Sequence, residues 1–254
     1  NMKDYFEQLL EKSNIKLEDS KIDILLEYLR LLTEKNKVMN LTAIREEKEI
    51  LEKHFIDSLL LSELFLHTDK KIIDIGTGAG FPGLVLAVAF PEKDFLLVDS
   101  VRKKISFIDE AAENLGLTNV KTSYERAEDL VTKSRSSFDL GLCRGVANLR
   151  IILEYMIPLL KVNGRFLPQK LNENELSESE NALKTLNSKI LKIHKFRLPE
   201  SNDERIIIEI QKLKIKDLNL SLQTENDKFK KAKEIFNEFN MLDSDIRDRL
   251  KGIF

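Results

Sequence analysis

The sequence predicts an α/β protein whose mostly parallel sheet is preceded by helices and ends in an antiparallel hairpin. From residue 71 to residue 187, apolar strand-like runs alternate with helix-like segments. This alternation is typical of parallel strands joined by crossover helices. Two further strand-like runs, residues 190–198 and 205–213, are separated by a linker too short for a crossover helix. These two runs are therefore expected to pair as a hairpin.

The stretch 71–99 is the part around which the rest of the chain is organised. A buried-type strand, residues 72–75, leads into a glycine loop, residues 76–80, and then a helix, residues 84–90, with Pro82 in its first turn. A second apolar run ends on Asp99. Gly76 and Gly78 allow a tight turn and a close approach of the backbone to a ligand. An acid at the next strand end can accept hydrogen bonds from ribose hydroxyls, so the stretch predicts a nucleoside-cofactor site.

The loop itself leaves two cofactors open. A dinucleotide site uses Gly-x-Gly-x-x-Gly, but Phe81 stands at the third glycine position. Asp74, just before the loop, suits an ammonium group better than a pyrophosphate. These features favour S-adenosylmethionine over a nicotinamide cofactor, and the closing hairpin is a second sign, since it is associated with methyltransferases rather than dehydrogenases. The alternative remains that the glycines only make a turn.

Composition excludes several classes of protein. The chain has 254 residues with 41 basic and 43 acidic side chains and a net charge of −2, so any nucleic-acid surface must be local. One cysteine, Cys143, excludes a disulfide framework and a multi-cysteine zinc site. No apolar run reaches the ~18 residues that a membrane helix needs. We expect no metal, no membrane association, a cytoplasmic location and a monomer.

Three segments are expected along the chain: a helical segment over residues 1–68, a cofactor-binding core over 69–216 and a linker with a helical extension over 217–254. In the first, a third helix is expected from residue 46 to 66, carrying His54 and Asp57 on one face. The pair either forms a local hydrogen bond or lies over the mouth of the cofactor site. In the last, Lys228 to Lys233 begin a basic amphipathic helix, which either packs on the body or touches RNA.

The elements between the glycine loop and the hairpin follow the same pattern. Gly116 is expected to end the first of the helices. In order, the expected elements are a helix over 102–115, a strand over 119–123, a short helix from 127, a strand over 138–143, a helix over 149–160, a strand over 164–168 and a polar helix over 172–187.

With these motifs in place, the chain resembles the bacterial 16S rRNA guanine-N7 methyltransferase RsmG (GidB) family. Three motifs together carry the resemblance: His-x-x-Asp-Ser at 54–58, Gly-Thr-Gly-x-Gly-x-Pro-Gly at 76–83 and Val-Asp-Ser at 98–100. The resemblance covers about residues 20–213. It implies a Rossmann-like class I S-adenosylmethionine-dependent methyltransferase fold, with 16S rRNA or a small-subunit precursor as the partner.

The resemblance also implies site residues. Gly76, Phe81, Ala127, Glu128 and Arg144 match cofactor-contacting positions, and they join Asp74, Gly78 and Asp99 from the analysis of the loop. The candidates for contact with RNA rest on a different argument. Because the net charge is negative, RNA must meet a local surface, and the residues expected near the mouth of the sheet are Arg45, Lys53, His54, Asp57, Lys170 and Arg205.

Two positions depart from the family pattern. Gly145 stands where alanine is usual, and Leu171 stands where glycine is usual. Both departures lie near the expected base pocket, so the shape of that pocket is less well defined by the resemblance than the cofactor site.

No residue is assigned as a catalytic acid or base, because guanine N7 has a lone pair and loses no proton on methylation. Two alternatives to a methyltransferase stay open at this point. One is a nicotinamide-dependent oxidoreductase. The other is a nucleotide- or RNA-binding module without turnover.

Overall fold

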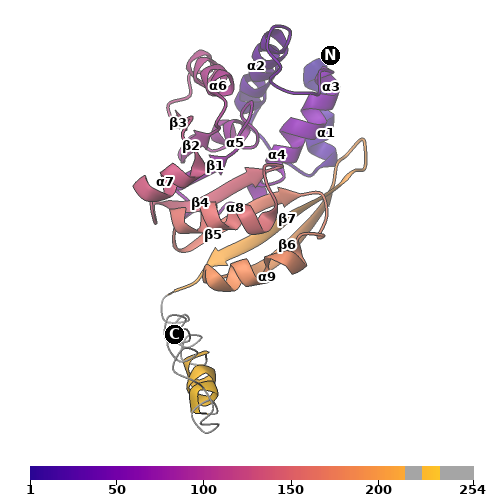
Figure 1. The fold of residues 1–254 in the computed structure, drawn as a ribbon. Coiled ribbons are helices and arrows are strands. Elements are labelled where there is room, and N and C mark those ends of the chain that lie inside the picture. Colours follow the sequence, from indigo (N-terminus) through magenta and orange to yellow (C-terminus); the bar gives the residue numbers. More distant parts are fainter. Residues whose placement is uncertain (215–224, 235–254) are drawn as a thin grey trace. The chain divides into compact units, whose positions relative to one another are not determined.

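The computed structural model describes residues 1–214 and 225–234. The chain divides into two compact units, Asn1–Lys212 and Leu213–Phe254 (Figure 1). The N-terminal helices and the α/β core belong to the first unit together. The finer division into segments 1–68, 69–216 and 217–254 stays a prediction.

A sheet of seven strands forms the centre of the first unit, in the order β3-β2-β1-β4-β5-β7-β6. The first five strands run parallel, and β7 pairs antiparallel with both β5 and β6. The predicted parallel sheet with a terminal hairpin is therefore confirmed. The strands are β1 (Lys71–Ile75), β2 (Asp94–Val98), β3 (Val120–Ser123), β4 (Phe138–Arg144), β5 (Leu160–Lys170), β6 (Ser188–Arg197) and β7 (Glu204–Lys212).

Helices cover both faces of this sheet and create two hydrophobic clusters (Figure 1). On one face, α5 (Gly83–Ala89) and α6 (Arg102–Asn114) pack with the N-terminal helices α1 (Met2–Lys12) and α2 (Asp19–Asn36). The other face is covered by α7 (Ala127–Lys133), α8 (Leu149–Met156) and α9 (Leu176–Thr185). The strand order reverses between β1 and β4, the place where α/β sheets form ligand crevices.

The third N-terminal helix is formed from Glu47 to Leu59, but it is not α-helical throughout and it is shorter than the predicted range 46–66. It consists of α3 (Glu47–Ile50), a π-helical stretch η1 (Leu51–Ile56) and α4 (Asp57–Leu59), and a 3-10 turn η2 (Ser62–Leu64) follows. A π-helical stretch is rare and changes the direction in which the following side chains point. Here it lies directly before Asp57 and contains His54.

Three other boundaries differ clearly from the sequence prediction. The helix expected over 149–160 ends at Met156, where Pro158 enters a 3-10 turn, η3 (Ile157–Leu159), because proline lacks the N–H of a helix interior. Strand β5 then begins at Leu160 rather than at residue 164, and α9 begins at Leu176 rather than at residue 172.

In the second unit, residues 225–234 are helical. The expected basic helix is thus helical over its described part, and Lys228, Lys230, Lys231 and Lys233 are exposed there. The sequence gives this helix an apolar face with Ile235, Phe236 and Phe239, which lie outside the described residues. A role of this helix in RNA binding stays a prediction.

Candidate active site

The glycine loop turns sharply over the carboxyl end of β2. Gly76, Gly78 and Gly80 have φ angles of +73°, +59° and +111°, in the region that favours glycine. The amides of Gly76 and Thr77 donate to the carbonyl of Val98 at 2.8 and 3.0 Å. The amide of Gly78 donates to Oδ2 of Asp99 at 2.9 Å. The predicted acid therefore holds the predicted loop in place.

The two glycines at the front of the loop are required for different reasons. A Cβ built on Gly76 would lie 2.1 Å from Cγ2 of Val146, because the loop after β4 folds over this position. A Cβ built on Gly78 would meet no atom within 4 Å. Gly76 permits a close approach of protein to protein, whereas Gly78 leaves open space beside the loop.

That space belongs to an open cleft of about 830 Å³ at the point where the strand order reverses. Six of the eight predicted cofactor-binding residues line it: Gly76, Gly78, Asp99, Ala127, Glu128 and Arg144. The cleft is also lined by neighbours of these positions that the sequence did not mark as cofactor-binding. Those neighbours are Ile75, Val98, Ser100, Lys104, Tyr124, Glu125, Arg126, Gly145 and Val146. Their position in the chain could have identified them, since all except Lys104 end a parallel strand or lie within three residues after one.

Asp74, the seventh predicted residue, lies beneath the loop and does not line the cleft. Its side chain is fully buried, and its Oδ2 accepts a hydrogen bond from the amide of Gly83 at 2.8 Å. Burial raises the pKa of Asp74 to about 8, although the Thr77 hydroxyl and the Gly83 amide act in the opposite direction. Asp74 thus connects β1 to the start of α5, and its contact with a cofactor stays a prediction.

Phe81, the eighth, is also buried under the loop. Its ring stacks on His54 at 4.7 Å between centroids and packs near Phe55 at 5.6 Å and Tyr28 at 5.6 Å. The Tyr28 hydroxyl donates to the carbonyl of Ala79 within the glycine loop. This aromatic cluster therefore supports the loop from the side of the N-terminal helices, and direct contact of Phe81 with a cofactor stays a prediction.

Arg144, at the end of β4, connects the cleft to the N-terminal helices. Its Nη1 donates to the carbonyl of Lys53 at 3.1 Å and to Oδ2 of Asp57 at 3.0 Å. Its Nη2 lies 2.9 Å from Nδ1 of His54, and its guanidinium lies 5.4 Å from the centre of the Phe81 ring. Among the described contacts, His54 and Asp57 meet through Arg144 and not through the local hydrogen bond considered above.

His54 is neutral and has hydrogen-bond partners on both ring nitrogens. Burial, aided by the neighbouring Arg144, lowers the pKa of His54 to about 3. A guanidinium can only donate, so Nδ1 accepts from Arg144 and the proton is on Nε2, 2.8 Å from the Thr42 hydroxyl. His54 therefore holds Arg144 in place and offers no free base.

Asp57 is shared by two arginines. Its side chain is only 3% exposed, and Arg205 from β7 approaches its Oδ1 with Nε at 3.2 Å, opposite the contact with Arg144. Buried carboxylates require such partners. The structure therefore brings four of the predicted RNA candidates, Lys53, His54, Asp57 and Arg205, around Arg144.

The other two candidates are bound by protein groups elsewhere. Arg45 donates to the carbonyl of Asn36 at 3.1 Å and to Asn40 at 2.8 Å. Lys170, at the end of β5, donates to the carbonyl of Ala147 at 2.7 Å and pairs with Glu175 at 3.1 Å. Lys170 thus holds the loop that contains Gly145 and Val146. In that loop Gly145, one of the two departures from the family pattern, has a φ of +58°, which a glycine adopts without strain. Contact of any of the six candidates with RNA stays a prediction.

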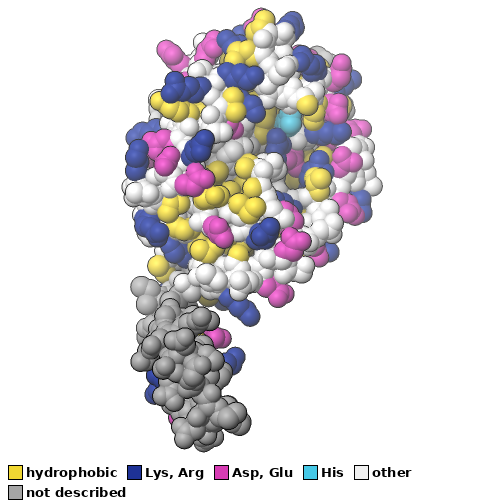
Figure 2. Space-filling model, in the orientation of Figure 1, with side chains coloured by type: hydrophobic (Ala, Val, Ile, Leu, Met, Phe, Trp, Pro, Cys, Tyr) yellow, Lys and Arg dark blue, Asp and Glu magenta, His cyan; other side chains and the backbone are white. Residues whose placement is uncertain are grey.

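The surface around the cleft is mixed in charge. Figure 2 shows acidic and basic side chains interspersed over this face of the first unit.

Burial raises the pKa of Cys143 to about 12, so the thiol is a core group rather than a nucleophile. In residues 1–214 and 225–234, no group of three or more His, Cys, Asp or Glu side chains could hold a metal ion, and no helix could span a membrane.

Comparison with known proteins gives one consistent family. A family model described as rRNA small subunit methyltransferase G (GidB) matches residues 21–206. The ribosomal RNA small subunit methyltransferase G of Fusobacterium nucleatum is 54% identical over 217 residues, which is 85% of this chain and 94% of that protein. The protein of the same name from Desulforamulus reducens is 42% identical, over 74% of this chain and 80% of its own length.

Solved structures with low sequence identity share the fold. The cyclase SpnF aligns over 78% of this chain and 97% of its own, with a TM-score of 0.54 and 12% identity. TrmN from Thermus thermophilus aligns over 64% of this chain and 53% of its own, with a TM-score of 0.50 and 18% identity. At these identities the likeness shows the fold alone, which is the Rossmann-like class I methyltransferase fold.

Proposed function

Because this chain belongs to the rRNA small subunit methyltransferase G (GidB) family, we propose that it methylates guanine N7 in 16S rRNA with S-adenosylmethionine as the methyl donor. The observation that carries the proposal is the convergence of the glycine loop, Asp99 and Arg144 on one cleft at the carboxyl edge of the sheet. This arrangement offers a cleft suited to a nucleoside, and beside it the anchored guanidinium of Arg144.

The cleft fits the proposed cofactor. Gly78 leaves open a space that a side chain would enter, which permits a ligand to lie against the loop. Asp99 uses one carboxylate oxygen for the amide of Gly78 and the other for that of Val101, both at 2.9 Å. Each carboxylate oxygen has a further lone pair for a ribose hydroxyl. Ala127 and Glu128 start α7 and line the same cleft, which supports the proposal that they meet the adenine edge.

The chemistry requires positioning rather than proton transfer. S-adenosylmethionine supplies a methyl group on a sulfonium, and guanine N7 attacks with a lone pair that carries no proton. The residues of this chain therefore act by holding the two reactants in line and by excluding alternative orientations. The neutral, doubly hydrogen-bonded His54 agrees with a site that has no general base.

Arg144 is the residue proposed to lie between the two reactants. It lines the cleft and is anchored from behind by Lys53, His54 and Asp57. A guanidinium in this position can donate to the guanine or to its phosphate without moving. The RNA would come from the side of β5 and β7. A bacterial rRNA substrate would place the enzyme in the cytoplasm, and we expect it to act as a monomer.

The test is methyl transfer to purified small-subunit rRNA and to small ribosomal subunits, with label in the methyl group of the cofactor. Nuclease digestion and mass spectrometry of the nucleosides should show 7-methylguanosine at one position. Label in another nucleoside would contradict the N7 assignment. A thermal shift should occur with S-adenosylmethionine and not with NAD. Stabilisation by NAD would support the oxidoreductase alternative. RNA binding without transfer would support a binding module.

A further inference from the structure

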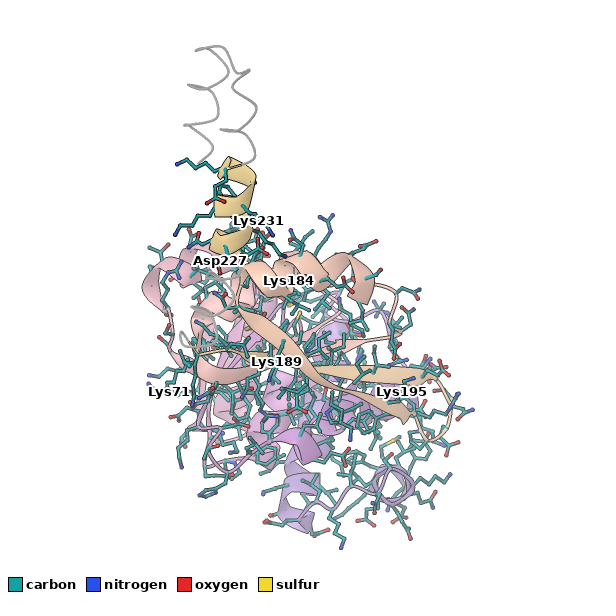
Figure 3. The ribbon with its side chains drawn as sticks, turned by 90° about the horizontal axis from the view of Figure 1, so that it is seen from below. Lys71, Lys184, Lys189, Lys195, Asp227 and Lys231 are labelled. Carbon is teal, nitrogen blue, oxygen red and sulfur yellow. The ribbon has the colours of Figure 1, made fainter. Side chains whose placement is uncertain are left out.

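A second cleft, of about 450 Å³, lies at the same edge of the sheet as the cofactor cleft. It lies at the end of β5, the start of β7 and the end of β6, and these three strand ends share one edge because Lys170 pairs with Ile206 and Phe196 with Arg205. Figure 3 shows Lys195 on the part of β6 that runs toward the hairpin turn, on the side opposite Lys71. The residues that line this second cleft are Leu171, Asn172, Glu173, Lys195, Phe196, Arg197, Glu204, Arg205 and Ile206.

One buried carboxylate connects the two clefts. Asp57 pairs with Arg144, which lines the cofactor cleft, and with Arg205, which lines the second cleft. The two ion pairs measure 3.0 and 3.2 Å. If the target base of an RNA strand lies in the first cleft, the nucleotides next to that base in the strand would therefore reach the second cleft.

The second cleft contains basic side chains that can exchange their carboxylate partners for phosphates of RNA. Lys195 pairs with Glu173 at 3.4 Å, and Arg197 pairs with Glu204 at 2.6 Å. All four of these side chains are largely solvent-exposed, and such surface pairs contribute only about 0–1 kcal/mol. Exchange of these carboxylates for phosphates therefore costs little. Arg205 is less exposed and remains bound to Asp57.

The second cleft also has an apolar surface. Leu171 lines this cleft and is 64% exposed. Phe196 lies in the same lining. Leu171 is also the position at which this chain departs from the glycine of the family pattern. Phosphate-binding cations beside an apolar or aromatic surface are the combination by which proteins hold single-stranded RNA.

We propose that this second cleft binds the RNA strand next to the target guanosine, with phosphates on Lys195 and Arg197 and a base or ribose against Leu171. This inference rests on the proposed function and adds to it the surface that orients the substrate. Arg205, held by Asp57, fixes the distance between this strand and the cofactor cleft.

The experiment compares cleft variants with matched controls at the opposite edge of the sheet. Lys195→Ala with Arg197→Ala removes the two exchangeable cations, and Leu171→Ala removes the apolar contact. The controls are Lys161→Ala, an exposed cation paired with Asp139 at 3.2 Å, and Val162→Ala, which is 45% exposed. Both controls lie at the amino end of β5, so they change charge or apolar surface away from the cleft.

Three quantities are measured for each protein: affinity for small-subunit rRNA at several salt concentrations, affinity for S-adenosylmethionine, and the single-turnover rate. The double variant should bind rRNA at least about tenfold more weakly, with a salt slope shallower by about 1.4–1.8 for two lost phosphate contacts. Leu171→Ala should bind several-fold more weakly with an unchanged slope. Both should bind S-adenosylmethionine as the wild type does.

The inference is overturned if the cleft variants bind rRNA with wild-type affinity and salt slope, or if they lose no more affinity than the controls. The proposed function still stands in that case if the wild type methylates rRNA. If the variants lose affinity for the small subunit but not for protein-free rRNA, the occupant is a protein and the inference also fails. Absence of rRNA methylation by the wild type would remove both proposals.

Discussion

Asp57 and Arg144, 87 positions apart in the sequence, form a largely buried ion pair with 3.0 Å between Oδ2 and Nη1. Asp57 comes from the N-terminal helices and Arg144 from the end of β4. Because Arg205 occupies the other side of the carboxylate, Asp57 cannot turn away from Arg144 without leaving a charge unpaired. The orientation of Arg144 at the cleft is therefore set by residues outside the cleft.

Replacement of Arg144 should affect methyl transfer more than RNA binding. Arg144→Ala should lower the single-turnover rate by at least about tenfold, the effect of ~1.4 kcal/mol in the barrier, while affinity for rRNA changes by a smaller factor. Arg150→Ala, an exposed arginine on α8, is the control for loss of charge. A loss of RNA affinity as large as the loss of rate would move Arg144 from the reacting groups to the general RNA surface.

Removal of the Asp57 carboxylate should destabilise the fold. Asp57→Ala leaves Arg144 and Arg205 without their shared partner, and a broken buried pair costs about 3–5 kcal/mol. Urea unfolding of Asp57→Ala, Arg144→Ala and the double variant measures this as a coupling energy. The double variant should be less destabilised than the sum of the single variants, by about 0.5–3 kcal/mol. Simple additivity would show that the two side chains do not stabilise one another.

Alanine at the two front glycines should have different effects. Gly78→Ala introduces left-handed strain of about 1–2 kcal/mol but displaces no protein atom, so the fold is retained and S-adenosylmethionine binding is weakened. Gly76→Ala must in addition displace Val146 and should unfold at lower urea concentration than Gly78→Ala. Adding Val146→Gly to Gly76→Ala should recover part of the loss. If it recovers none, the contact with Val146 is not the reason for a glycine at position 76.

Asp99 should contribute to cofactor affinity through the ribose. Asp99→Ala should weaken S-adenosylmethionine binding by about 1.5–3 kcal/mol, the range for a hydrogen bond to a charged group. In the variant, the 2′-deoxyribose analogue should lose little further affinity by calorimetry. Asp94→Ala, at the exposed start of the same strand, is the control. Full additivity of the substitution and the deoxy change would argue that Asp99 acts only on the loop.

The buried acid Asp74 should make stability depend on pH. Its pKa is raised to about 8 in the native state by burial, from 3.8. Between these values the native state holds a proton that the unfolded state has released, so this group makes stability fall as pH rises, by up to ~1.4 kcal/mol per pH unit. Asp74→Asn is neutral in both states and lacks this contribution. The free energy of unfolding of the wild type relative to Asp74→Asn should therefore fall from pH 5 to 8. The control is Asp94→Asn, which removes an exposed carboxylate. If the curves of unfolding free energy against pH for the wild type and Asp74→Asn are parallel from pH 5 to 8, Asp74 is ionised in the native state over this range.

Local sequence signals predicted the parts of the fold that depend on short spacing. The glycine loop, the acid that ends β2 and the hairpin of β6 and β7 each have their determinants within a few residues, in backbone freedom, strand periodicity and linker length. The π-helical stretch in the third N-terminal helix was not predictable in this way. Its buried residues, among them Leu51, Phe55 and Ile56, are compatible with the apolar pattern of an ordinary helix.

By itself, the sequence determined that this chain has an α/β core with a glycine loop and an acid, Asp99, at neighbouring strand ends, because strand ends and glycine turns are local features. Only the tertiary structure decided what surrounds Arg144. Asp57 and Arg205 lie in separate segments, and their ion pairs exist because the carboxyl edge of the sheet meets the N-terminal helices. Tertiary contacts likewise placed Asp74 and Phe81 beneath the loop rather than in the cleft. The physical reason is that burial and charge pairing depend on which segments meet in space, and spacing along one segment does not contain that information.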